Sequence, residues 1–219
     1  AKELGSPAYK VVQSDARVLG NNKDGIDFSL EDDYYGDTRF HIPFIAWYQV
    51  MNASLALTTM EVLKDRIPVT MEQLQAGIAN TRWQGRMETI LPGVIVDGAH
   101  NEDGVRRFVE TAERFQKEYP LTLLFSAVND KDYQDMIHTI CSRIKFRKVV
   151  TTEVGGYREV PSAELAEIFC KEGCKDVGNS DNIEEAFHMA HEAKGEDGML
   201  FCVGSLYLVG EIKTLLLKK

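Results

Sequence analysis

From about residue 82 onward, short runs of residues are apolar on both faces of an expected strand. The runs begin at Val94, Leu121, Lys148, Lys175 and Met199, at intervals of about 24 to 28 residues. Segments with apolar positions at helical spacing separate them, at 105–115, 133–144, 163–172 and 183–194, and a further helix follows the run at Met199. This alternation predicts an α/β fold: a Rossmann-like, mostly parallel sheet with helices on both faces.

Residues 1–80 lack this alternation. The pattern predicts strands at 11–12, 17–19, 26–30 and 39–42, a turn at 20–25, and helices at 44–64 and 71–78. Thr70 is the expected N-cap of the second helix. A segment this small buries too little surface to close a core alone. We therefore predict two parts: the end of a preceding domain at 1–80, and a complete α/β domain at 81–219.

The composition limits the kinds of molecule that this chain is expected to bind. There are 34 acidic and 25 basic residues among 219, a formal net charge of −9, and 44% of the residues are hydrophobic. An acidic chain is not expected to bind nucleic acid, because phosphates require a basic surface. With four cysteines and no segment patterned like a leader or a membrane span, we expect a reduced, cytoplasmic protein that does not bind membranes.

The first candidate site lies where the run that starts at Val94 ends. Asp97 closes this strand, a tight turn at 98–99 follows, and Asn101 can cap the next helix. Because ligands of parallel sheets bind at the carboxyl ends of the strands, Asp97 and His100 project toward an expected ligand site beside a helix N-terminus. The alternative is a turn in which Asp97 only satisfies backbone amides.

Two further positions suit anions. Arg86 follows a glycine just before a strand, where a guanidinium can bind phosphate, or it can form a surface ion pair with Glu88. Ser205 follows the run at Met199 and is an expected N-cap, so the exposed amides after it can hold an anion. In the alternative, Ser205 is a cap and nothing more.

Polar side chains also interrupt an apolar helix and a loop. Gln49 and Asn52 are three residues apart and share a helix face, where amides either cap neighbouring loops or bind a ligand. In the alternative, they are buried amides whose hydrogen bonds are satisfied within the protein. Lys131 and Asp132 follow another expected strand and lie either at the ligand edge or in a solvated loop.

Other known motifs are not found. Gly20 and Gly25 have the glycine spacing of a P-loop, but residues 26–27 are Ile-Asp where Lys-Ser or Lys-Thr is required. Cys170 and Cys174 lack a second cysteine pair, so a zinc site is not expected. These residues therefore predict no metal site.

Five short segments, taken together, resemble one family. They are Gln49-Val50-Met51-Asn52-Ala53, Gly85-Arg86-Met87-Glu88, Asp97-Gly98-Ala99-His100-Asn101, Lys131-Asp132 and Gly204-Ser205-Leu206-Tyr207. Their order and spacing resemble those of folylpolyglutamate synthases and dihydrofolate synthases, members of the Mur ligase superfamily. The resemblance covers the C-terminal half of such an enzyme. One departure is Tyr48, which stands where the family commonly has a histidine and cannot carry a positive charge.

The resemblance implies an activity for the whole enzyme. Such an enzyme uses ATP to phosphorylate a carboxylate of a folate, and the amino group of L-glutamate then attacks the acyl phosphate; a related activity joins glutamate to dihydropteroate. Residues 1–80 would be the C-terminal remnant of the central ATP-binding domain, and 81–219 the Mur ligase C-terminal domain. The Mg²⁺ ligands and the P-loop would lie in an N-terminal ATPase domain outside this sequence. The chain alone is therefore expected to be inactive, and the protein to be a monomer.

The resemblance also implies roles for single residues. Asn52 would contact adenine, Arg86 the ATP phosphates, and Asp97 the nucleotide ribose, with a link to domain closure. His100 and Ser205 would lie nearest the incoming glutamate, and Asp97 and His100 would be the catalytic residues. Two other functions remain open: a Mur-type ligase that adds an amino acid to a cell-wall precursor, and a non-catalytic domain that binds a nucleotide or an amino acid.

Overall fold

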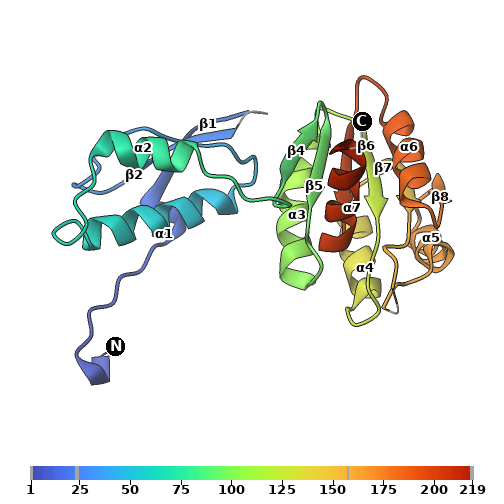
Figure 1. Ribbon diagram of the computed structural model, residues 1–219, viewed down its shortest axis with the longest axis horizontal. Coiled ribbons are helices and arrows are strands. Elements are labelled where there is room, and N and C mark those ends of the chain that lie inside the picture. Colours follow the sequence, from blue (N-terminus) through green and yellow to red (C-terminus); the bar gives the residue numbers. More distant parts are fainter. Residues whose placement is uncertain (1, 23–24, 157, 218–219) are drawn as a thin grey trace. The chain divides into compact units, whose positions relative to one another are not determined.

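The computed structural model describes residues 2–22, 25–156 and 158–217. The chain forms two compact units, Ala1–Arg82 and Trp83–Lys219 (Figure 1). The described residues of the first unit form two short 3-10 helices, three strands and two α-helices: η1 (Lys2–Leu4), η2 (Gln13–Asp15), β1 (Ala16–Asn22), β2 (Gly25–Leu30), β3 (Phe40–Ile42), α1 (Tyr48–Val62) and α2 (Met71–Ala79).

The strands of the first unit form an antiparallel sheet in the order β1-β2-β3. Phe28 and Phe40 face each other across β2 and β3, with ring centroids 5.7 Å apart, in a buried core that also includes residues of α1 and α2. Thr70 caps α2, as predicted, by accepting the N–H of Gln73. Residues 23–24 of the predicted turn lie outside the described residues.

The predicted strand at 11–12 is wrong. Val12 is exposed, and its N–H donates to the carboxylate of Asp15 at 2.7 Å, which begins η2. A strand is stable only beside a partner strand, and β1 starts later, at Ala16. The local side-chain hydrogen bond therefore determines the conformation at these two valines.

The second unit contains the alternating elements that the sequence predicts. They are β4 (Glu88–Leu91), β5 (Val94–Asp97), α3 (Glu102–Phe115), β6 (Leu121–Phe125), α4 (Tyr133–Arg143), β7 (Phe146–Thr151), α5 (Ser162–Lys171), β8 (Val177–Asn179), α6 (Ile183–Lys194), β9 (Met199–Val203) and α7 (Leu206–Leu217). Among the residues that the structure describes, six strands have the order β4-β5-β9-β6-β7-β8, and only β4 is antiparallel to its neighbour. The predicted α/β class with a mostly parallel sheet is confirmed, whereas β4 was not predicted.

Helices cover both faces of this sheet (Figure 1). The side chains of β9 pack against helices on both sides. Leu200 and Cys202 point into a core cluster with residues of α6 and α7. Phe201 points the other way and contacts Phe108 of α3, with ring centroids 5.5 Å apart. This alternation follows from the two-residue period of a strand, and burial on both faces explains why the run is apolar throughout.

The carboxyl edge of the sheet is bordered by helix N-termini. Asn101 caps α3 through the N–H of Gly104, as predicted, and Asp132 caps α4 through the N–H of Asp135. Unpaired N–H groups at such ends favour anions. Among the described residues, no helix is long and apolar enough to cross a membrane.

Gly204 provides a test of how tightly this edge is packed. Its φ is +109°, and a Cβ there would lie 2.1 Å from the carbonyl oxygen of Ser126. Gly204→Ala should therefore lower the free energy of unfolding by about 2 to 5 kcal/mol, from backbone strain and overpacking. Gly210→Ala on α7, where a Cβ meets no atom within 4 Å, should instead be neutral or stabilising. Guanidinium unfolding of both variants checks this, and a loss below about 1 kcal/mol for Gly204→Ala would contradict it.

Candidate functional site

The candidate site of the second unit lies at the carboxyl ends of β5 and β9. Asp97, the final residue of β5, is paired in register with Val203, the final residue of β9. The segments that follow these strands also meet, because a Cβ at Gly98 would lie 2.2 Å from the side chain of Leu206. Two of the segments that carry the family resemblance therefore lie side by side.

Asp97 is buried beneath this edge, with 4% of its surface exposed. Its Oδ2 accepts the backbone N–H of Met87 and its Oδ1 accepts that of Ala99, each at 2.8 Å. The carboxylate thus joins the segment before β4 to the turn after β5. This arrangement is the alternative interpretation of Asp97 that the sequence left open, in which the side chain satisfies backbone amides.

The environment of Asp97 alters its acidity. Burial raises the pKa of this carboxyl to about 6, because the charged form loses its hydration. The N–H groups of Met87 and Ala99, and the positive charge of Arg86, act in the opposite direction, as does His100 when its ring is protonated. Arg86 and His100 therefore lie near enough to affect the charge of Asp97.

The segment that carries Arg86 is held at several points. Gly98 N–H donates to the Gly85 carbonyl at 2.8 Å, and Met87 has a left-handed backbone with φ of 46°. The carboxylate of Glu88 accepts the Gly85 N–H at 2.8 Å and pairs with Lys213 at 2.7 Å.

The surface ion pair between Arg86 and Glu88, the alternative that the sequence left open, does not form. Lys213 of α7 pairs with Glu88 instead, and no side-chain partner of the half-buried Arg86 is found in the described part of the chain. The guanidinium of Arg86 is therefore available to an anion, while the backbone on both sides of it is fixed.

His100 lies at the same edge and is half-buried. Its Nδ1 is 2.7 Å from the carbonyl oxygen of Gly98. A carbonyl only accepts hydrogen bonds, so Nδ1 carries the proton, and Nε2 of the neutral ring is left as an acceptor. Nε2 can therefore accept a proton or hydrogen bond from a bound ligand.

Ser205 caps α7, as the sequence predicts. Its Oγ accepts the Tyr207 N–H at 3.1 Å, and its carbonyl accepts the Val209 N–H. The side chain is buried, with 2% of the residue exposed, and its hydroxyl proton remains available for donation.

Two loops and the first turn of α7 extend this edge past the predicted residues. Arg158, in the loop after β7, binds the carboxylate of Asp130 at 3.1 Å and the hydroxyl of Tyr207 at 3.0 Å. A pocket of about 220 Å³ lies beside them, lined in part by Asn101 and Lys131. Sequence analysis missed Arg158 because no motif surrounds it, and only the fold brings its loop to the other two.

Asn52 belongs to the first unit. It is exposed on α1, and its amide donates to Oε1 of the buried Gln49 at 2.8 Å. Gln49 therefore fits the alternative of a satisfied buried amide, whereas Asn52 is exposed and is not a buried amide. Across the residues that the structure describes, no group of three or more His, Cys, Asp or Glu side chains could hold a metal ion.

Comparison with known proteins identifies the class. Residues 85–206 match the family model described as Mur ligase, glutamate ligase domain. The chain belongs to this family. The match includes Arg86, Asp97, His100 and Ser205, so all four candidates of the second unit fall within the family's domain.

Two curated relatives have folylpolyglutamate synthase in their names. The dihydrofolate synthase/folylpolyglutamate synthase of Bacillus subtilis is 29% identical over 212 residues, which cover 91% of this chain and 47% of that protein. A probable bifunctional folylpolyglutamate synthase/dihydropteroate synthase of Haloferax volcanii is 28% identical over 175 residues, covering 79% of this chain and 20% of the relative.

A solved structure agrees. The folylpolyglutamate synthase of Mycobacterium tuberculosis, determined in complex with ADP and AMPPCP, has a TM-score of 0.73 and 25% identity. The similarity covers 93% of this chain and 48% of that structure. The resemblance to folylpolyglutamate synthases is thereby confirmed, and the chain spans about half the length of the Bacillus and Mycobacterium proteins.

The raised pKa of Asp97 predicts a pH dependence of stability. The pKa of Asp97 is about 6 in the folded protein against a normal value of 3.8. The stability that the protonated carboxyl contributes is therefore fully present below pH 4 and is lost as the pH rises through 6. Relative to Asp97→Asn, the free energy of unfolding of the wild type should fall by about 3 kcal/mol between pH 4 and 7. Guanidinium unfolding across this range measures the difference.

Asp103→Asn is the control for this prediction. Asp103 is exposed, and its hydrogen bonds with Arg107 and Arg106 lower its pKa. The difference in free energy of unfolding between the wild type and Asp103→Asn should therefore be small, and it should change with pH in the opposite direction. If the difference in free energy of unfolding between the wild type and Asp97→Asn does not change with pH, the pKa of this buried carboxyl is not raised.

Proposed function

We propose that this chain is the C-terminal part of an ATP-dependent amide ligase that adds L-glutamate to a folate, as a folylpolyglutamate synthase. The dihydrofolate synthase activity, in which glutamate is added to dihydropteroate, is proposed as a second activity of the same enzyme. One observation carries the proposal: Arg86, in a segment fixed by buried Asp97, lies at the edge where His100 and the N-terminus of α7 also lie.

Arg86 is proposed to bind the phosphates of ATP. A guanidinium neutralises phosphate charge best when its backbone is already fixed, because little reorganisation is then needed as charge develops. Asp97, buried and bound to two backbone N–H groups, would act by positioning Arg86. The predicted contact between Asp97 and the nucleotide ribose remains a proposal, and it would require the edge above this carboxylate to open.

His100 and Ser205 are proposed to bind the incoming glutamate. The Ser205 hydroxyl and the first N–H groups of α7 suit a carboxylate. Nε2 of His100 can accept a proton from the ammonium group of glutamate, which must lose a proton before the nitrogen attacks an acyl phosphate. This part of the site would therefore activate the nucleophile.

ATP and Mg²⁺ are the proposed cofactors. In bound MgATP the cation would neutralise phosphate charge, but no acidic cluster in the described residues fits Mg²⁺. Its ligands and the P-loop are therefore assigned to a preceding ATPase domain. The first unit, with the proposed adenine contact Asn52, would be the remnant of that domain, and Tyr48 would contribute no positive charge there.

The folate branch is favoured over the cell-wall branch of this family. Both curated relatives described above have folylpolyglutamate synthase in their names. The small-molecule partners proposed are therefore ATP, L-glutamate and a folate or dihydropteroate, in a cytoplasmic, monomeric enzyme. The chain by itself is proposed to be inactive.

The complete protein encoded with this chain tests the proposal. It should release ADP only when glutamate and a folate or dihydropteroate are present, with a product heavier by one glutamyl group. Arg86→Ala should lower kcat by about 100-fold or more, and Arg86→Lys by less. Arg143 lies at the C-terminal end of α4, away from this site, and pairs with Glu113 of α3. Arg143→Ala should therefore leave kcat unchanged.

Other outcomes would refute the proposal. Turnover of a cell-wall precursor in place of a folate would favour the other branch of the family. A reading frame that encodes no ATPase domain before this chain would favour a non-catalytic binding domain.

Ser205 requires a control because it also caps a helix. Ser205→Ala should raise KM for glutamate about 10-fold or more, since a carboxylate loses a hydrogen bond. Asn182→Ala removes the cap of α6, where Asn182 accepts the Glu185 N–H at 2.9 Å, and should cost similar stability without changing KM. Initial rates at varied glutamate concentration give the KM of each variant. If KM rises equally in both variants, Ser205 acts only as a helix cap.

A further inference from the structure

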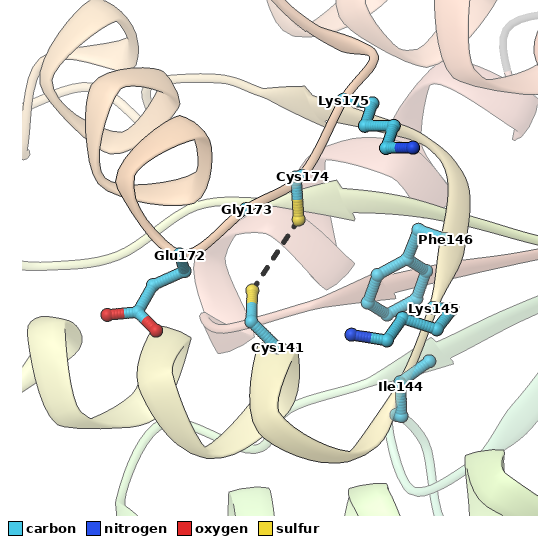
Figure 2. A pocket seen from close by; sticks show the side chains of 8 residues that line it. All are labelled: Cys141, Ile144, Lys145, Phe146, Glu172, Gly173, Cys174 and Lys175. Carbon is cyan, nitrogen blue, oxygen red and sulfur yellow. Dashed lines mark hydrogen bonds between the residues drawn. The ribbon is translucent and has the colours of Figure 1, made fainter.

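A second pocket of the α/β unit lies at the opposite edge of the sheet from the candidate site. It has a volume of about 360 Å³ and lies where α4 and α5 end and β7 begins. Figure 2 shows two cysteine side chains that point toward each other in it, Cys141 from α4 and Cys174 from the loop between α5 and β8. Neither residue has a part in the proposed ligase reaction.

The two sulfur atoms are in direct contact. Their Sγ atoms are 3.6 Å apart, close enough for one thiol to donate a hydrogen bond to the other. Cys141 is buried and Cys174 is half-buried, so Cys174 is the one that solvent reaches more readily. The residues are 33 positions apart, and only the fold brings them together.

The surroundings make Cys174 the nucleophile of the pair. The hydrogen bond from Cys141 and the positive charge of Lys145 lower the pKa of Cys174, although burial and Glu172 oppose them. The same hydrogen bond, with burial, raises the pKa of Cys141. Lys145 extends toward the sulfur atoms from one side, and Glu172 lies on the other (Figure 2). A thiolate beside a lysine is the reactive form of cysteine.

A disulfide would require only a small displacement of the two sulfur atoms. Bonded sulfur atoms lie about 2.05 Å apart, so the two must approach by about 1.5 Å. Gly173 precedes Cys174 with a φ of +90°, and no heavy atom lies within 4 Å of the place its Cβ would occupy. The half-buried Cys174 thus follows an exposed glycine and lies opposite a cysteine in a helix.

We propose that Cys141 and Cys174 form a redox-active dithiol that a hydroperoxide oxidises to a disulfide. The Cys174 thiolate attacks one peroxide oxygen and the O–O bond breaks, which leaves a sulfenic acid on Cys174 and releases water or an alcohol. The Cys141 sulfur then displaces the hydroxyl group, which leaves as water with the Cys141 proton. Two thiols are oxidised for each hydroperoxide reduced, and a thiol reductant reverses the change.

The other two cysteines have no such arrangement. Cys202 lies in the middle of β9 and is fully buried. Cys170 is exposed on α5, and no sulfur partner of it is found in the described part of the chain. Cys170, four residues from Cys174, is therefore a control that shows how readily exposure alone allows a cysteine to be oxidised.

The test uses the reduced chain treated with hydrogen peroxide. Thiols counted after denaturation should fall from four to two, and peptide mass spectrometry without reduction should find Cys141 joined to Cys174. Dithiothreitol should restore all four. Cys170→Ser should lose two thiols at the wild-type rate, whereas Cys174→Ala, altered in a loop, should lose none under the same conditions.

Cys141→Ala tests the order of the steps. Without the second thiol, the sulfenic acid on Cys174 should persist and react with dimedone, and no disulfide should form. Circular dichroism shows whether this buried substitution leaves the fold intact, and the result for Cys174→Ala does not depend on it. The proposal is overturned if the wild type keeps four thiols, if the disulfide joins other cysteines, or if Cys170 is oxidised as fast as Cys174.

Discussion

A buried carboxylate bound to two backbone N–H groups organises the ligand edge of the α/β unit. Asp97 connects the segment before β4 with the turn after β5, and the orientation of Arg86 and the start of α3 depend on that connection. Burying a charge is costly unless hydrogen bonds compensate, and here they compensate in part, so the pKa remains raised. The same contact therefore defines the shape of the edge and makes it sensitive to protonation.

Most of the fold could be predicted from hydrophobic periodicity, because strands buried on both faces and amphipathic helices have different periods. The antiparallel strand β4 could not, since its residues are only half-buried and give no clear period. Val11 and Val12 show the opposite error: their β-branched side chains favour a strand, but Asp15 binds the Val12 backbone in a 3-10 turn. Local propensity fails where a strand has no partner or where a side chain competes for the backbone.

The local structure of the candidate site was predictable where one short segment determines it, as at the caps Asn101 and Ser205. It was not predictable where distant segments determine a residue's partner. Glu88 pairs with Lys213, 125 positions away, and so leaves Arg86 available. Arg158 and the pair formed by Cys141 and Cys174 are likewise brought to their partners by the topology alone.

The strand order has a consequence for how this unit forms during synthesis. β9 lies in the middle of the sheet, between β5 and β6, yet follows all the other strands of that sheet in sequence. On the ribosome, β5 and β6 therefore emerge before the strand that joins them, and their apolar edges remain uncovered until residues 199–203 are made. The whole sheet can therefore be completed only once residues 199–203 have been made, and chaperones would be needed most before then.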